Sequence, residues 1–227
     1  MRKEHIKRAV SVAAVVLCLC VLALPSHAQQ TAATDASVKL PPPKLDGNVS
    51  VEKALTERRS VRAYKSEPLS LDEVSQILWS AQGVTDAGKG LRTTPSPKGQ
   101  FLIEVYLVAG NVTGLPAGLY RYQPKEHALI KMAEGDKKAD LSKAVPQPAV
   151  AGAPASLIIC GVPERSAANP AWIYLEAGHA AENVYLQATA IKLGTVSIAG
   201  FKPEDVKKAL PLPEKQQPIY IMPLGRK

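Results

Sequence analysis

The sequence is poor in the residues that several kinds of site and fold require. Its 227 residues include only three Cys, two Trp and two Phe. Cys18 and Cys20 fall in one short apolar run, so a disulfide framework and a Cys-rich zinc site are both excluded. Cys160 lies in the apolar stretch 157–162 and is expected to be a small buried hydrophobic residue rather than a nucleophile. With few aromatics and no run of Lys or Arg, the chain is not expected to bind nucleic acid.

The motifs of common catalytic and metal sites are missing as well. No G-x-G-x-x-G follows a predicted strand, and the sequence has neither a Walker loop nor a G-x-S-x-G elbow. Glu176, His179 and Glu182 are spaced three apart in one predicted helix, as in half of a di-iron site. Because such a site needs a second Glu-x-x-His and further glutamate-bearing helices, these residues are interpreted as a polar stripe. No metal site and no catalytic side chain are predicted.

The N-terminus has the pattern of an export signal. Four Lys or Arg residues precede an uncharged run from Ala9 to Leu24, and Ser26-His27-Ala28 places small residues before the expected cleavage point. We expect residues 1–28 to be removed and the protein to be periplasmic or secreted, with a retained membrane anchor as the alternative. After cleavage 24 basic and 19 acidic residues remain, which is a net charge of +5.

Composition divides the remainder into an arm and a folded domain. Residues 29–48 are rich in Gln, Thr, Ala and Pro and are predicted to be a linker or extended arm, whereas 49–227 are predicted to form the domain. Helices are predicted from Val51 after a Ser50 cap, from Leu71 to Gly83 after a Ser70–Glu73 capping box, over 136–144, over 171–193 and from Pro203 to Leu210. Strands are predicted over 101–108, 118–122, 127–132, 155–162 and 219–223.

The order of these elements favours an α+β fold, because helices and strands are mixed rather than strictly alternating. The helix over 171–193 has apolar residues on most of its faces, so it should run through the core or into a subunit interface. Residues 85–100 form a long loop rich in Gly, Pro and Thr, and loops of this length inside a compact domain are usually functional or disordered.

Basic residues at both ends of the domain are candidates for binding an anion. Arg58 and Arg62 stand one helical turn apart with the Ser60 hydroxyl between them, and Arg226 and Lys227 follow the final strand. Guanidinium groups match phosphate oxygens in a bidentate manner, so these side chains could form a cage around a phosphate. On these residues alone, a solvated Arg-rich helix end that neutralises nearby carboxylates is the stronger interpretation.

Several stretches of the sequence stand out together. They are Arg58-Arg59-Ser60-Val61-Arg62-Ala63-Tyr64, Thr94-Pro95-Ser96-Pro97, Gly118-Leu119-Tyr120-Arg121-Tyr122 with the helical stretch 178–186, the segment 194–201, and Gly225-Arg226. In this order they resemble the motifs of the FMN-dependent nitroreductase family over roughly residues 50 to 227. The third group is similar to the subgroup that contains the thiazoline/oxazoline oxidases of peptide modification.

The resemblance implies an α+β sandwich, a mixed or antiparallel sheet flanked by helices, that dimerises and builds two FMN sites from both chains. It further implies the cofactor-binding residues Arg58, Arg59, Ser60, Arg62 and Arg226 around the phosphate, Pro95, Ser96 and Gly99 beside the ribityl chain and ring, and Ala199 and Gly200 with backbone N–H groups toward flavin N5.

The activity that the resemblance implies is a general FMN-dependent oxidoreductase rather than a peptide azoline oxidase. Hydride or electrons would pass through flavin N5 to a small organic substrate, with NAD(P)H or another donor as the source. The alternative is an exported, non-catalytic protein that keeps the fold to hold flavin or a ligand in its place.

Overall fold

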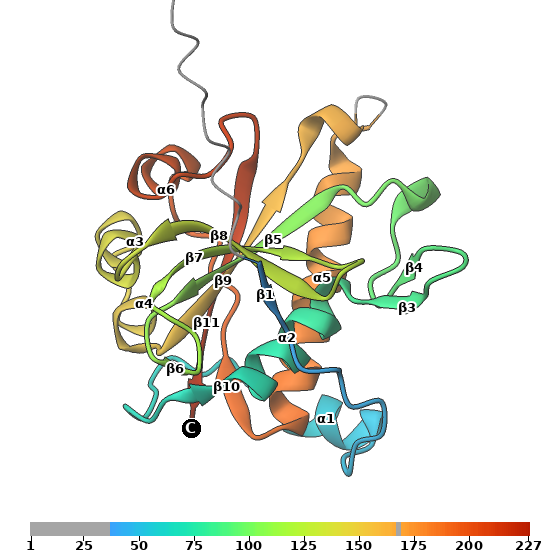
Figure 1. The fold of residues 1–227 in the computed structure, drawn as a ribbon, viewed down its shortest axis with the longest axis horizontal. Helices are drawn as coiled ribbons and strands as arrows, with labels where there is room; N and C mark the ends of the chain where they lie inside the picture. Colours follow the sequence, from blue (N-terminus) through green and yellow to red (C-terminus); the bar gives the residue numbers. More distant parts are fainter. Residues whose placement is uncertain (1–36, 167–168) are drawn as a thin grey trace, which may run out of the picture. The chain divides into compact units, whose positions relative to one another are not determined.

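The computed structural model describes residues 37–166 and 169–227, and its centre is a seven-stranded sheet with helices on both faces (Figure 1). Every neighbouring pair of strands in this sheet is antiparallel. The strand order is β1 (Ser37–Lys39), β8 (Ala128–Glu134), β7 (Gly118–Gln123), β5 (Ile103–Ala109), β9 (Ala155–Gly161), β11 (Gln217–Arg226) and β10 (Leu193–Thr195). The predicted α+β class and flanked sheet are confirmed.

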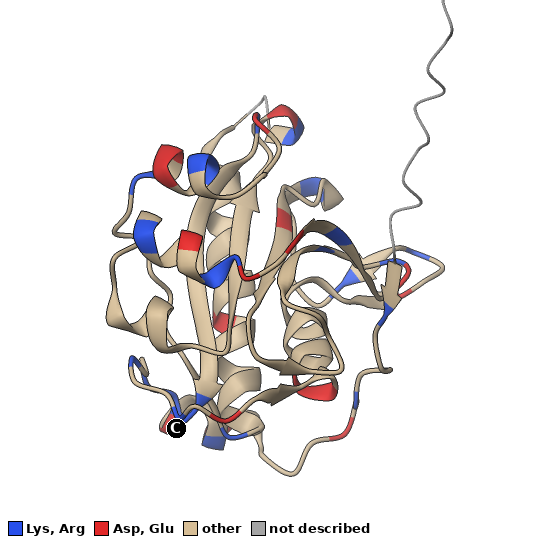
Figure 2. Ribbon diagram, turned by 60° about the vertical axis from the view of Figure 1, so that its left-hand side comes forward, with Lys and Arg blue, Asp and Glu red and all other residues tan. Residues whose placement is uncertain are grey.

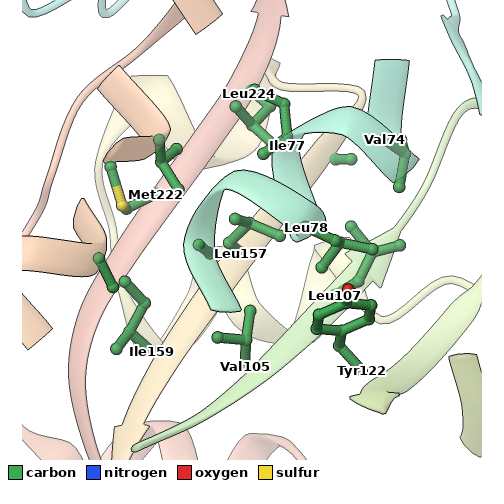
Figure 3. Packing of buried hydrophobic residues seen from close by; sticks show 14 of the residues in the cluster. Val74, Ile77, Leu78, Val105, Leu107, Tyr122, Leu157, Ile159, Met222 and Leu224 are labelled. Carbon is green, nitrogen blue, oxygen red and sulfur yellow. The ribbon is translucent and has the colours of Figure 1, made fainter. Parts of the chain in front are cut away.

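Side chains of the central strands alternate between two hydrophobic cores, one on each face of the sheet. Val105 and Leu107 pack with Leu157 against α2 (Leu71–Gln82) and α5 (Ala171–Ala190); Figure 3 shows Ile77 and Leu78 of α2 over these strands. The opposite core packs against α3 (Lys138–Ala144), α4 (Pro148–Gly152) and α6 (Pro203–Ala209). Cys160 lies fully buried in this second core, where burial raises the pKa of its thiol, as expected of a structural Cys.

Two helices begin at the caps that the sequence predicts. The Ser50 hydroxyl accepts a hydrogen bond from the Lys53 N–H at 3.2 Å and starts α1 (Val51–Glu57). Ser70 and Glu73 form the full capping box of α2, because each side chain accepts a bond from the other residue's backbone N–H. The α5 helix ends at Ala190, before the predicted end at 193, and β11 extends well past the predicted 219–223.

Part of the segment that is predicted to be a linker or extended arm belongs to the sheet. Ser37–Lys39 forms β1, which pairs with β8, and Leu40 is buried. The Lys44 N–H then donates to Gln76 of α2 at 2.8 Å. The strand is only three residues long, and Pro41-Pro42-Pro43 follows closely. The segment therefore shows no alternation of apolar residues, which explains why its composition does not predict a strand.

The predicted loop over 85–100 contains short regular elements. A two-stranded hairpin joins β3 (Val84–Asp86) to β4 (Leu91–Arg92), and a 3₁₀ turn, η1, spans Pro97–Gly99. Elsewhere β2 (Leu69–Ser70) pairs in parallel with β6 (Val112–Thr113), and a second 3₁₀ turn, η2, covers Pro163–Ser166.

Over residues 37–166 and 169–227, none of the helices combines the length and the apolar character that crossing a membrane requires. The expected signal peptide at 1–28 and its cleavage point lie outside the described residues.

Candidate functional site

An extended segment from Ser60 to Lys65 runs along the edge of the sheet, beside β10 and the end of β11. Ser60 forms an isolated parallel bridge with Thr195, and the Val61 N–H donates to the Thr195 carbonyl at 2.9 Å. Four residues on, the Lys65 N–H donates to the Arg226 carbonyl at 3.0 Å. The structure therefore brings together the two chain regions that the sequence proposes as one anion site. We call this region, Ser60–Lys65 with β10 and the end of β11, the Ser60 edge.

Two glycines allow these backbones to approach so closely. A Cβ at Gly194 would lie 2.7 Å from the Val61 side chain, and a Cβ at Gly225 would lie 2.7 Å from Tyr64. Both separations are too short for non-bonded carbon atoms, so a larger residue at either position would push the segment away. The Tyr64 hydroxyl donates to the Val61 carbonyl at 2.6 Å, and burial raises its pKa.

The arginines predicted to bind phosphate differ in what they contact. The Arg58 guanidinium lies 5.1 Å above the centre of the Tyr185 ring, and Arg62 is exposed. The Arg59 guanidinium turns back toward its own helix and donates to the Thr56 and Arg58 carbonyls. Of the three, Arg59 is thus tied to local backbone, whereas the Arg58 guanidinium packs over the Tyr185 ring.

Arg226 is held by two carboxylates. Its Nη1 lies 2.9 Å from Glu73 Oε1, and its Nε lies 3.3 Å from Glu67 Oε2. Glu73 is the capping-box residue of α2, so one carboxylate serves both the helix start and this arginine. Guanidinium has five N–H donors, and two carboxylates leave part of that capacity for a further oxygen ligand.

A cavity of about 410 Å³ opens at the same place, and most of its charged lining is basic. Lys65, Lys192, Arg226 and Lys227 line it, together with Thr189 and Glu57. Figure 2 shows Lys and Arg gathered around the C-terminus. Sequence reasoning missed Lys65 and Lys192. Lys192 is the second residue after the end of α5 and has φ +62, and a basic residue near a helix end was the available signal.

Tyr185 of α5 is a second residue that sequence reasoning missed. It is 7% exposed, and its hydroxyl lies 3.1 Å from the Ser60 hydroxyl. The same oxygen accepts a bond from the Ser197 N–H at 2.8 Å. One buried phenol therefore connects the arginine-bearing motif to the segment predicted to face flavin N5. No local pattern in the sequence indicates such a contact, because it joins residues 125 positions apart.

The segment predicted to face N5 presents unused backbone donors. Ala199 and Gly200 are both exposed, and they follow Ile198, which exchanges two backbone bonds with Ile221 of β11. Ala199 and Gly200 lie outside helices and strands. Within the described part of the chain, neither of their N–H groups donates to a backbone carbonyl. Adjacent N–H groups fixed beside a rigid strand suit a ligand that offers hydrogen-bond acceptors.

The loop from Pro95 to Gly99 is fastened to the core by a buried carboxylate. Glu176 is 0% exposed, and its Oε2 accepts bonds from the Ser96 hydroxyl at 2.6 Å and the Leu102 N–H at 3.0 Å. Ser96 in turn accepts from the Phe101 N–H at 2.8 Å. The Ser96 hydroxyl is thus committed to the protein, while Pro95 and Gly99 stay exposed.

The predicted polar stripe on α5 is only partly observed. His179 and Glu182 are exposed, but Glu176 lies on the buried side of the helix, where it binds the loop. The three residues therefore do not share one face. In the described ranges, no three His, Cys, Asp or Glu side chains gather closely enough to hold a metal ion.

Comparisons with known proteins agree on one relationship. The model of the nitroreductase family matches residues 55–226. A protein of Methanocaldococcus jannaschii, whose name describes it as a nitroreductase, is 37% identical over 185 residues, which cover 79% of this chain and 92% of that protein.

Solved structures extend this relationship to the fold. A crystal structure from Ralstonia eutropha JMP134, also described as a nitroreductase, superposes with a TM-score of 0.73 at 30% identity and covers 84% of this chain and 89% of the other. The E. coli microcin synthetase complex McbBCD contains a chain with a TM-score of 0.68 at 22% identity, covering 82% and 76% respectively, which shows likeness of fold alone.

Proposed function

The chain belongs to the nitroreductase family, and from that premise we propose that it is an FMN-dependent oxidoreductase acting on a small organic substrate. Membership itself implies oxidoreductase activity of the flavin-dependent kind. The identity of the flavin as FMN, the residues that hold it and the transfer of hydride are the further content of the proposal.

The observation that carries the proposal is the geometry of the Ser60 edge. Arg58, Ser60 and Arg62 come from one segment and Arg226 from the last strand, and backbone bonds from Val61 and Lys65 hold the two together. The cavity beside this segment is lined by Lys65 and Arg226, and clustered cations of this kind suit a phosphate monoester. These residues would hold the FMN phosphate, with Lys192 as an additional cation.

The ring would lie beside Ala199 and Gly200. Their exposed N–H groups would donate to an acceptor at the ring edge, which favours negative charge there. FMN, when bound, supplies the hydride-transfer chemistry. The chain's own contribution is to anchor the phosphate, to fix the ring and to offer these donors, so no side chain is required as a nucleophile.

A second copy of the chain would complete the site. Tyr174 and Leu175 of α5 and Leu55 of α1 are each more than half exposed, and an interface with another chain would cover this apolar surface. We propose that they pack in a homodimer, in which Pro95 and Gly99 of one subunit lie beside the flavin of the other. NAD(P)H or another donor would supply the electrons.

Absorbance of the purified protein tests the flavin. We expect a yellow protein whose flavin bleaches with NADH, NADPH or dithionite and recovers with an acceptor. Protein that stays colourless and takes up no added FMN would instead support the non-catalytic alternative. Export is tested separately, by cell fractionation and N-terminal sequencing, with Gln29 expected as the first residue of the mature chain.

Variants of the arginines test the location. Arg58→Ala and Arg62→Ala should each weaken FMN binding by roughly 1.5–3 kcal/mol, the range for hydrogen bonds to charged groups. Arg59→Ala is the matched control, because its guanidinium already binds local carbonyls and its loss should leave the affinity within about 0.5 kcal/mol. Equal affinities in all three variants would place the phosphate elsewhere.

A further inference from the structure

A cavity of about 670 Å³ lies on another part of the surface and has no assigned role. It shares no lining residue with the cavity at the Ser60 edge. Its walls come from the β3–β4 hairpin, the start of β5, the turn between β7 and β8, and η2. The volume is within the range of about 300–1,000 Å³ that is usual for small-molecule sites.

The charged side chains around this cavity are mostly cationic. Lys89, Arg92, Lys125 and Arg165 line it, against the single carboxylate of Glu104. That carboxylate is already paired with Arg165. Lys89 is paired in turn with Asp86 of β3. Two cations, Arg92 and Lys125, are therefore left without a carboxylate among the ion pairs of the described residues.

Of the two cations, Arg92 is the stronger indication of an anion site because it is half-buried. Its Nη1 donates to the neutral Gln82 amide oxygen at 2.9 Å, and its guanidinium lies 3.9 Å from the centre of the Phe101 ring. Burial lowers the pKa of Arg92, while the charges of Glu104 and Glu176 act in the opposite direction. A partly buried cation without a direct counterion gains more from an incoming anion than a solvated lysine does.

The backbone beside Arg92 is held in an uncommon conformation. Lys98 and Phe101 have φ values of +54 and +51, in the left-handed region that bulky residues rarely adopt. Phe101 is fixed there from both sides, because its N–H donates to Ser96 and its carbonyl accepts from Arg165 at 2.8 Å. Such strain persists where surrounding contacts impose it, and it is common at binding sites.

We propose that this cavity binds a small organic anion, a carboxylate or a phosphate, between Arg92 and Lys125. Binding follows from the charges and the enclosed volume and does not depend on flavin. The cavity also includes Gln100, directly after the loop that would lie beside the ring. Identifying the anion as the substrate of the enzyme, or as its charged group, rests on the proposed function.

Calorimetric titration of the protein, as purified, with benzoate and with inorganic phosphate at low ionic strength tests this proposal. We expect at least one of them to bind with a dissociation constant of about 1 mM or below. Lys125→Gln should weaken that binding about threefold, as for an exposed ion pair. Arg92→Met should weaken it about tenfold or more, as for a charged hydrogen bond. If only benzoate binds, the site takes carboxylates, and if only phosphate binds, it takes phosphates.

The matched control is Lys208→Gln on α6, an exposed lysine whose removal changes the net charge by the same amount. Equal weakening by Lys208→Gln and Lys125→Gln would overturn the proposal, as would the failure of both anions to saturate. Binding of both anions that is kept in Arg92→Met would also overturn it, and phosphate binding that is lost in Arg62→Ala would at the same time support the Ser60 edge. If Arg92→Met does not fold, the comparison of Lys125→Gln with Lys208→Gln tests the proposal without it.

Discussion

Two serines in motifs that resemble flavin contacts have opposite surroundings. Ser60 is exposed, and among the described residues its hydroxyl contacts the uncharged phenol of Tyr185. Ser96 is bound by the fully buried carboxylate of Glu176. A charge-assisted bond of this kind is strong and leaves little freedom for a ligand, whereas a neutral contact at the surface is easily shared. Ser60 is therefore available for binding, while Ser96 mainly shapes its loop.

The largest expected effect comes from removing the carboxylate. Glu176→Ala should lower the free energy of unfolding by about 3–4 kcal/mol, because each buried donor left unpaired, at Ser96 and Leu102, costs about 1–3 kcal/mol. Urea denaturation measures this loss. Glu182→Ala, an exposed glutamate on the same helix, should change stability by less than about 0.5 kcal/mol. A small loss in Glu176→Ala would remove the contrast between the two serines.

The second effect concerns the close approach at the Ser60 edge. Gly225→Ala should destabilise the protein by about 1–3 kcal/mol, since the new methyl group would overlap the Tyr64 side chain. It should also weaken FMN binding, because the segment that carries Ser60 must move. Thermal melting and FMN titration are the measurements. Gly152→Ala is the control, as a Cβ there meets nothing within 4 Å. Unchanged FMN affinity in Gly225→Ala would show that the edge tolerates displacement.

Tyr185→Phe tests the surroundings of Ser60 in the comparison with Ser96. It removes the hydroxyl between Ser60 and the Ser197 N–H, and we expect a loss of about 1–2 kcal/mol in unfolding free energy. FMN affinity should fall as well. Tyr174→Phe removes an exposed hydroxyl of the same helix, which accepts a bond from the Gln217 side chain at 3.2 Å, and should change stability by less than about 0.5 kcal/mol. An effect on stability without any effect on FMN would make Tyr185 purely structural.

The smallest effect involves a third serine, whose partner can titrate. Ser75 lies 2.7 Å from Nε2 of His127, and burial lowers the pKa of that imidazole from its ordinary 6.5. Between the lowered pKa and 6.5 the unfolded chain binds more protons than the folded one, so stability is complete above pH 6.5 and declines below it.

Urea titrations of the wild type and His127→Asn at several pH values check this dependence, as Asn tolerates the left-handed φ of +45 at this position. The decline should be smaller in the variant. A wild type whose stability is flat across this range would mean that His127 does not titrate differently on folding.

Local signals made most of the fold predictable. The Ser50 cap and the Ser70–Glu73 box act within one helical turn, and each marks the observed start of its helix. The uninterrupted apolar stretch around Cys160 likewise predicted a strand buried on both faces. The α5 helix ended before its apolar pattern did, because Lys192 in left-handed conformation reverses the chain.

The site was predictable only in its outline. The positions of Ser60 and Arg226 followed from the family motifs, but their contacts depend on residues far apart in the chain. The spacing of Glu176 and His179 predicts a polar stripe, whereas the buried hydrogen bonds from Ser96 and Leu102 decide the role of Glu176. Tyr185 joins the site through tertiary packing, for which a sequence pattern contains no signal, and the position of Lys192 at a helix end is only a weak one.

The short strand β1 has a consequence for how the protein can be shortened. It occupies the outer side of β8, and the Leu40 N–H continues the pairing to the His127 carbonyl at 3.1 Å. A chain trimmed to begin at Val49 would leave the hydrogen-bonding groups along β8 open to the strands of other molecules. Such a truncated protein is expected to aggregate, although every residue proposed to contact the flavin would still be present.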